Sequence, residues 1–280
     1  MTDHAWIDKK LKINGDLAES ILTNFVHDEI TRHGFQRAVI GLSGGIDSSL
    51  AAFVAAKALG PKNVLAVRMP YQTSSESSLE DAATVIEQLG LEELTVDITP
   101  MVEPLFKRFP DMDKVRQGNV MARQRMIILY DQSAAFDGLV VGTGNKTELL
   151  LGYSTLFGDS ACALNPNGDL YKTQIRQLAG HMDVPQTIID KPPSADLWIG
   201  QTDEDELGYT YQRVDRLLYL LIDDRFSHDE CVDAGFEREF VNGVSNRVRR
   251  MHFKRVMPPI AKVSNRTIGY DFLYPRDWGT

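Results

Sequence analysis

Residues 38–59 read AVIGLSGGIDSSLAAFVAAKAL, and this stretch decides the fold. The apolar run from Ala38 to Leu42 is typical of a buried strand. The Ala- and Leu-rich run from Ser48 to Leu59 predicts a helix, which Gly60-Pro61 ends. The glycine loop from Ser43 to Gly45 joins the two elements, so the stretch forms one strand, loop and helix unit.

Strands and helices continue to alternate along the chain, which indicates a parallel sheet with right-handed crossovers. We predict a Rossmann-like α/β fold, a doubly wound parallel sheet flanked by helices, in a single domain spanning residues 1–280. A long irregular loop is expected from Lys191 to Asp205, before a mostly helical C-terminal part from Glu206 to Arg255. The further predicted elements are strands at Asn63–Met69, Leu94–Ile98 and Leu139–Val141, helices at Ser78–Leu89 and Asn119–Phe136, and a tail broken by Pro258, Pro259 and Pro275.

The loops that follow three predicted strands are expected to build the binding site. In open parallel sheets, ligands bind beyond the carboxyl ends of the strands. The loops after Leu42, Met69 and Val141 should therefore meet at one crevice, the last of them being the glycine-rich turn at residues 142–145.

The charge and cysteine content narrow the class of partner. A net charge of −9, from 30 Lys and Arg against 39 Asp and Glu, favours a small molecule over a nucleic acid. No apolar run approaches the roughly 20 residues needed to cross a bilayer, and no leader pattern opens the sequence, so we expect no membrane partner and a cytoplasmic location. Cys162 and Cys231 are expected to be reduced thiols, with no metal-ligand spacing of Cys or His.

The string Ser43-Gly44-Gly45-Ile46-Asp47-Ser48-Ser49 has the composition of a phosphate-binding loop. Glycines let the backbone approach a ligand, while N–H groups, hydroxyls and the helix N-terminus attract phosphate oxygens. A carboxylate beside phosphates requires a cation between them, so Asp47 is interpreted as a magnesium ligand. A plain helix N-cap is the alternative. The string has no Walker A lysine, which disfavours kinase or GTPase chemistry.

SGGIDSS resembles the signature of the ATP pyrophosphatases, the N-type adenine nucleotide alpha hydrolase superfamily, whose members cleave ATP between the α and β phosphates. Within that superfamily the rest of the chain, from about Ile40 onward, resembles the ammonia-dependent NAD synthetases. The motifs that carry this resemblance are GNVMARQRM at 118–126, GTGNKTE at 142–148, GDLYKTQ at 168–174, KPPSADL at 191–197 and DEDELG at 203–208.

The resemblance implies a set of site residues, each matched to a family position. Asp47, Lys172 and Asp159 would be catalytic, with Lys172 neutralising the departing pyrophosphate and Asp159 holding ammonium and accepting its proton. Asp47 and Glu148 would bind Mg²⁺, and Asn119, Arg123, Phe253 and Lys254 would bind deamido-NAD. The implied ATP contacts are Gly41, Leu42, Ser43, Gly44, Gly45, Ile46, Asp47, Ser48, Arg68, Thr143, Lys172 and Ser194.

The resemblance also implies the reaction. ATP would adenylate the nicotinate carboxylate of deamido-NAD, and ammonia would displace AMP to give NAD, with pyrophosphate as the other product. No glutamine amidase domain is expected, because only about 40 residues precede the loop. The segment 152–159 and the loop around Ser194 would exclude water as lids. The family forms homodimers, for which residues 119–136 and 206–222 are the candidate surfaces.

The chain departs from the family pattern at substrate positions. Leu156 stands where many relatives have a lysine, Ala163 where a second aspartate is usual, and Phe253 interrupts the common His-Lys-Arg. Arg123 is then alternatively a surface arginine, Asp159 a turn former, and Cys162 a packing residue. The competing functions are another ATP pyrophosphatase, such as a tRNA thiolase, and a module that senses a nucleotide without turnover.

Overall fold

The computed structural model describes residues 4–194, 198 and 201–272. Their sheet is parallel, in the order β3-β2-β1-β4, with β1 (Arg37–Gly41), β2 (Val64–Arg68), β3 (Glu92–Thr95) and β4 (Gly138–Val141). The strand order turns back at β1, so the crevice between β1 and β4 is the place where such sheets bind ligands. The prediction of a doubly wound parallel α/β fold is confirmed.

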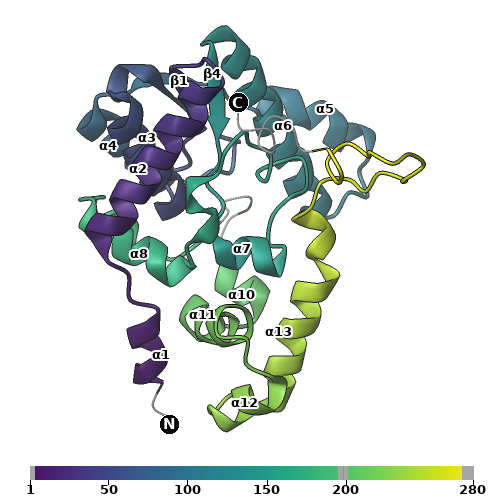
Figure 1. Cartoon of the computed structure of the whole chain (residues 1–280). Coiled ribbons are helices and arrows are strands. Elements are labelled where there is room, and N and C mark those ends of the chain that lie inside the picture. Colours follow the sequence, from purple (N-terminus) through teal and green to yellow (C-terminus); the bar gives the residue numbers. More distant parts are fainter. Residues whose placement is uncertain (1–3, 195–197, 199–200, 273–280) are drawn as a thin grey trace.

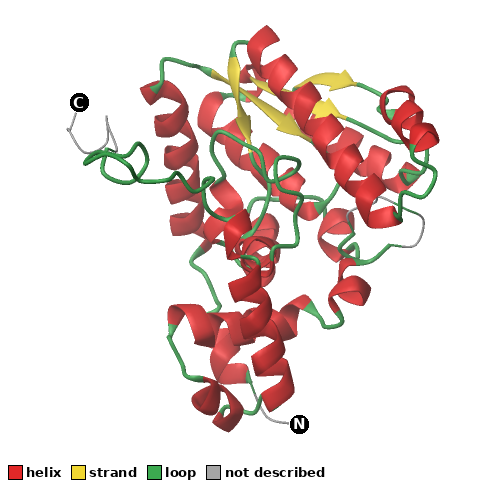
Figure 2. Ribbon diagram, turned by 90° about the vertical axis from the view of Figure 1, so that its right-hand side faces the viewer, coloured by secondary structure: helices red, strands yellow, loops and turns green. Residues whose placement is uncertain are grey.

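Helices cover both faces of this sheet (Figure 2). Ala38 and Ile40 of β1 pack into one apolar core, whereas Val39 between them packs into the opposite one. This alternation follows from the two-residue period of a strand. The first face is covered by α2 (Gly15–Arg32), α3 (Ile46–Leu59), α4 (Glu76–Leu89), α8 (Lys172–His181) and α9 (Gln186–Asp190), and the second by α5 (Thr99–Arg108) and α6 (Lys114–Ala135).

A second, helical part lies below the sheet in Figure 1 and has its own apolar core. The N-terminal helix α1 (Ala5–Lys10) joins this part, because Ile7 is buried there and Asp8 accepts two hydrogen bonds from Arg216, at 2.7 and 2.6 Å. The predicted helical C-terminal part is confirmed. Its elements are α10 (Asp203–Leu207), α11 (Tyr211–Leu218), a π-helical turn Tyr219–Asp223, α12 (His228–Asp233), α13 (Arg238–Arg250) and a 3-10 turn His252–Lys254.

Some element boundaries differ from the predicted ones. The strand predicted at Leu94–Ile98 begins at Glu92 and ends at Thr95, because this edge strand is mostly exposed and carries no clean apolar run. Helix α6 begins at Lys114, five residues earlier than predicted, where Asp113 caps it by accepting from the Arg116 N–H. The predicted loop 191–205 includes residues 195–197 and 199–200, which lie outside the described residues, as does Pro275. No described helix is long and apolar enough to span a bilayer.

Candidate active site

The glycine loop after β1 is shaped by serine hydroxyls. The Ser48 hydroxyl donates to the Gly45 carbonyl at 3.0 Å and accepts from the Ser43 N–H at 3.2 Å, while Ser49 also donates to the Gly45 carbonyl at 2.9 Å. Gly44 has a φ of +80°, and an added Cβ would lie 2.1 Å from the Ser78 carbonyl oxygen. Only glycine fits there. The loop therefore exposes backbone at the N-terminus of α3.

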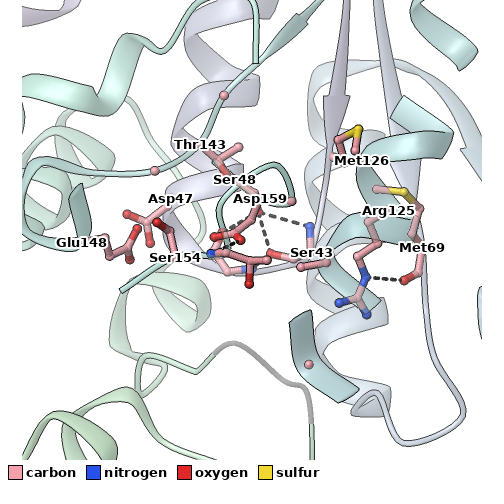
Figure 3. A pocket seen from close by; sticks show the side chains of 18 of the residues that line it. Ser43, Asp47, Ser48, Met69, Arg125, Met126, Thr143, Glu148, Ser154 and Asp159 are labelled. Carbon is pink, nitrogen blue, oxygen red and sulfur yellow. Dashed lines mark hydrogen bonds between the residues drawn. The ribbon is translucent and has the colours of Figure 1, made fainter. Parts of the chain in front are cut away.

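Asp47, in the first turn of α3, meets side chains from two later elements. Lys172, the first residue of α8, donates to Asp47 Oδ2 and, at 3.4 Å, to Glu148 Oε1. Asn145 donates to Asp47 Oδ1 at 2.8 Å. Asn145 and Glu148 are the N-cap and third residue of α7 (Lys146–Leu151), where they form a capping box. The start of one short helix thus places both an amide and a carboxylate beside Asp47, and Figure 3 shows the carboxylates of Asp47 and Glu148 close together.

The Lys172 ammonium is buried in a surplus of negative charge. Its side chain is only 4% exposed, and it lies 5.1 Å from the centre of the Tyr211 ring. Burial alone would lower the pKa of Lys172, but Asp47 and Glu148 outweigh burial and raise the pKa. Burial, and then the charge of Asp47, raise the pKa of Glu148 to about 8. At neutral pH the site therefore holds Lys172 as a cation paired with Asp47.

A buried aspartate fixes the start of α8. Asp215 of α11 accepts from the Thr147 hydroxyl at 2.6 Å and from the Thr173 N–H at 2.8 Å. Thr147 in turn accepts from the Lys172 N–H at 3.0 Å. Burial raises the pKa of Asp215 to about 6. This network fixes the N–H groups of Lys172 and Thr173 through Thr147 and Asp215, so the position of the Lys172 side chain depends on the helical part as well as the sheet.

Asp47, Glu148 and Lys172 line a cavity of about 500 Å³ at the carboxyl ends of β1, β2 and β4. Figure 3 shows Ser43, Asp47, Thr143 and Glu148 in this pocket. The convergence of three strand-end loops is therefore confirmed. The predicted site residues that line the cavity are Gly41, Leu42, Ser43, Gly45, Asp47, Ser48, Arg68, Asn119, Thr143, Glu148, Asp159, Lys172, Ser194 and Lys254.

Four predicted residues lie away from the cavity lining. Gly44 and Ile46 are buried beneath the loop, and Phe253 is 57% exposed. Arg123 is exposed and donates from Nε to the Leu156 carbonyl at 3.3 Å. Arg125, which was not predicted, lines the cavity together with Arg68, and its Nε donates to the Met69 carbonyl at 3.0 Å (Figure 3).

Asp159 lies on the cavity wall at the end of the loop that follows α7. Its Oδ1 accepts from the Thr155 N–H at 2.7 Å, which fixes the carboxylate on its own loop. The side chain is open to the cavity but is surrounded by protein, and this burial raises the pKa of Asp159. Cys162, nearby, packs against Gly142, and burial raises the pKa of its thiol, as expected of a packing residue.

Sequence patterns missed a cluster of polar contacts among residues that line or adjoin the cavity. The Tyr153 hydroxyl contacts Asp203 Oδ1 at 3.2 Å and Glu206 Oε2 at 2.9 Å, and the Tyr211 hydroxyl donates to Asp203 Oδ2 at 3.1 Å. Gln201 donates to Glu206 at 2.8 Å. The acids belong to the DEDELG motif, but their tyrosine partners are distant in sequence and no local spacing signals them.

The fold and this site together define an α/β nucleotide-binding protein with a glycine loop for phosphates, a buried lysine and two adjacent carboxylates. The family model for NAD synthase matches residues 19–258. The chain belongs to the NAD synthase family.

Individual relatives are similar in sequence to this protein along almost the whole chain. The NH(3)-dependent NAD(+) synthetase of Trichlorobacter lovleyi is 56% identical over 270 residues, which cover 96% of this chain and 99% of the relative. That of Chlorobaculum parvum is 51% identical, covering 96% of this chain and 97% of the relative.

Solved structures give the same fold. An NMN synthetase from Francisella tularensis superposes with a TM-score of 0.78 at 33% identity, covering 89% of this chain and 99% of that one. An NH3-dependent NAD synthetase from Campylobacter jejuni has a TM-score of 0.76 at 34% identity, covering 90% and 100%. These likenesses extend over the helical part as well as the sheet.

Proposed function

We propose that this protein is an ammonia-dependent NAD synthetase. It adenylates the nicotinate carboxylate of deamido-NAD with ATP and amidates it with ammonia, which gives NAD, AMP and pyrophosphate. The observation that carries the proposal is the buried Lys172, held between Asp47 and Glu148 beside the glycine loop, in a chain that is 56% identical to a relative of that name.

The phosphates of ATP are proposed to lie against residues 41–48 at the N-terminus of α3, with Arg68, Thr143 and Ser194 as further contacts around the same cavity. The Lys172 ammonium reaches this position from the buried end of the cavity. A fixed cation there stabilises the negative charge that grows on pyrophosphate as it leaves, and it needs no reorganisation during the reaction.

Magnesium is proposed at Asp47 and Glu148. The donor set fits a hard divalent cation, because both residues present carboxylate oxygens and phosphates would complete the coordination. The charges fit as well, since Asp47, Glu148 and the nearby Asp203 outnumber Lys172; burial, followed by the charge of Asp47, raises the pKa of Glu148. When bound, the ion would neutralise phosphate oxygens. No described group of three or more His, Cys, Asp or Glu is arranged to hold a metal by itself.

Asp159 is proposed to hold ammonium and accept its proton. Its carboxylate is open to the cavity and its pKa is raised by burial, which makes it a stronger base than an exposed aspartate. Asn119, Arg123, Phe253 and Lys254 were predicted to bind deamido-NAD. Three of them contact the loop that carries Asp159, through Thr155, Leu156, Gly152 and Ser154, so the dinucleotide is proposed to bind near this loop.

We further propose that the enzyme acts in the cytoplasm as a homodimer. The exposed apolar side chains Ile127 and Tyr130 of α6, which are 55% and 42% exposed, support this helix as part of the interface, with residues 206–222 as the second segment. Light scattering after size exclusion gives the mass directly, and a monomer at micromolar concentration would contradict the dimer.

The test mixes the protein with ATP, Mg²⁺, ammonium and either deamido-NAD or its mononucleotide counterpart, and follows AMP and amide together. The mononucleotide is included because one structural neighbour is an NMN synthetase. NAD and AMP in equal amounts, lost in Asp47→Asn and kept in the exposed control Asp111→Asn, are expected. If AMP forms only with the mononucleotide, then the mononucleotide and not deamido-NAD is the substrate. If no AMP forms with either acid, a nucleotide-sensing module is favoured.

A further inference from the structure

Helix α13 and the 3-10 turn after it bring three cations to the end of α7 and the turn that follows it. Arg247, Lys254 and Arg255, which we name the C-terminal clamp, all donate to carbonyl oxygens and to no carboxylate in the hydrogen bonds described for them. The bonds run from Arg247 to Leu151 (2.9 Å), from Arg255 to Leu149 (3.2 Å) and Leu150 (2.9 Å), and from Lys254 to Gly152 (2.8 Å) and Ser154 (2.6 Å).

Three of the five carbonyls that the clamp binds, those of Leu149, Leu150 and Leu151, belong to the end of α7, and those of Gly152 and Ser154 follow it. The last carbonyls of a helix lack intrahelical N–H donors and carry the negative end of the helix dipole. Helix α7 ends at Leu151, and its C-cap Gly152 has a φ of +62°; an added Cβ at Gly152 would lie 2.4 Å from Cβ of Met251. The end of α13 is therefore in direct contact with the turn after α7.

This turn joins two groups of the proposed site. Glu148 lies four residues before Gly152, and Asp159 lies seven residues after it. Helix α6 holds the middle of the loop, because Asn119 accepts from the Thr155 hydroxyl at 2.7 Å. Lys254 is the clamp residue nearest to this loop, since it alone reaches past Gly152 to Ser154, and Thr155 is bonded directly to Asp159.

We propose that Lys254 is a positioning residue for the amidation step: its ammonium holds the Gly152 and Ser154 carbonyls so that the loop presents Asp159 to the cavity. This inference rests on the proposed function. In the step concerned, ammonia nitrogen bonds to the carboxyl carbon of the acyl adenylate and the carbon–oxygen bond to AMP breaks. AMP keeps that electron pair; Asp159 holds the first proton, taken from ammonium as ammonia forms, and the departing AMP phosphate takes the second.

The surroundings of Lys254 are consistent with a structural cation. Its ammonium has two carbonyl partners, at 2.8 and 2.6 Å, which use most of its three donors. Burial lowers the pKa of Lys254, while the charge of Asp159 acts in the opposite direction, and the two groups stabilise each other's charged forms. A lysine with two bonds to the backbone has little capacity left for a dinucleotide phosphate.

The test separates the two half-reactions in Lys254→Met, with Lys254→Arg as the conservative variant and the exposed Lys62→Met as control. Exchange of labelled pyrophosphate into ATP, driven by deamido-NAD without ammonium, reports adenylation alone. NAD formation against ammonium concentration reports amidation. Deuterium exchange over residues 152–160 reports the loop, and a thermal melt shows that each variant folds.

We expect the rate of pyrophosphate exchange by Lys254→Met to stay within about threefold of that of the unaltered protein, with the same KM for deamido-NAD. Its KM for ammonium should rise about tenfold or more. AMP should then accumulate without NAD, the Thr155 amide should lose protection, and Lys254→Arg should recover part of each effect. If Lys254→Met does not fold, the same measurements are made on Lys254→Gln, whose amide keeps one donor pair for the carbonyls.

Two results would overturn the inference. A raised KM for deamido-NAD in the exchange assay, with an unchanged KM for ammonium, would make Lys254 a direct substrate contact. Unchanged kinetics in a folded variant would remove Lys254 from the reaction altogether. Failure of the unaltered protein to make NAD is a separate outcome, because it refutes the proposed function before any Lys254 variant is measured.

Discussion

Glu148→Gln should make the ligand-free protein more stable while abolishing its activity. Glutamine has the same shape as glutamate and can keep the capping box with Asn145, so α7 should still begin at the same residue. Lys172 keeps Asp47 as its partner. The substitution therefore removes one buried negative charge and little else, and the proposed magnesium site loses one of its two carboxylates.

The size of the effect follows from the pKa of Glu148, which is raised from 4.5 to about 8 by burial and by Asp47. Above pH 4.5 the unfolded chain releases this proton while the folded chain retains it, so stability falls as the pH rises towards 8 and is constant beyond. At about 1.4 kcal/mol for each pH unit between the two values, the full cost is on the order of 5 kcal/mol. Desolvating the glutamine amide offsets part of it, so a gain of about 2–4 kcal/mol is expected at pH 9.

Urea unfolding at pH 5.5, 7 and 9, with Glu87→Gln as an exposed control on α4, measures this gain. The stability difference between Glu148→Gln and the unaltered protein should widen with pH, and the control should show none. Mg²⁺ with ATP should stabilise the unaltered protein and have little effect on the variant. Parallel pH profiles for the variant and the unaltered protein would refute the idea of surplus buried charge at this site.

Three further changes test other parts of the site. Lys172→Met should slow pyrophosphate exchange about 10²–10³-fold, and an unchanged rate would exclude the lysine from stabilising the leaving group. Gly44→Ala places a methyl group 2.1 Å from the Ser78 carbonyl at a φ of +80°, so calorimetry should show ATP affinity reduced about tenfold or more; normal affinity would mean that the loop yields easily. Gly243→Ala, in α13 with nothing within 4 Å of the new Cβ, should raise the free energy of unfolding by about 0.5–1 kcal/mol, and a lower urea midpoint would contradict that open environment.

The sheet was predictable because its central strands are continuous apolar runs. β1 and β2 lie between two cores, so both faces of each strand must be apolar, and the pattern is visible locally. The edge strand β3 has one covered face and exposed glutamates, which shifted its predicted boundaries. Helix α7 is only six residues long, and its sole local signal is the capping pair Asn145 and Glu148.

The candidate site also contains residues that the local sequence predicts and residues that it does not. The glycine loop and Asp47 are contiguous, so their chemistry can be recognised from spacing alone. Lys172 is 125 residues from Asp47 and was identified only through the family resemblance. Asp203 is bonded to two tyrosine hydroxyls and Lys254 to two backbone carbonyls. No residue pattern encodes such partners, because any sequence supplies carbonyls and only the fold decides which of them lack donors.

The position of the C-terminal clamp in the sequence also sets an order of events as the chain is synthesised and folds. A nascent chain that has emerged through Lys172 already carries the glycine loop, Asp47, Glu148 and Asp159, yet the cations that bind carbonyls 149–154 arrive only with Arg247 to Arg255. Until those residues leave the ribosome, the carbonyls of Leu150, Leu151, Gly152 and Ser154 lack the side-chain donors that bind them in the complete fold. Messages cut short before Arg255 should therefore yield chains with a formed sheet and an unfinished turn, which cellular proteases can distinguish from the complete protein.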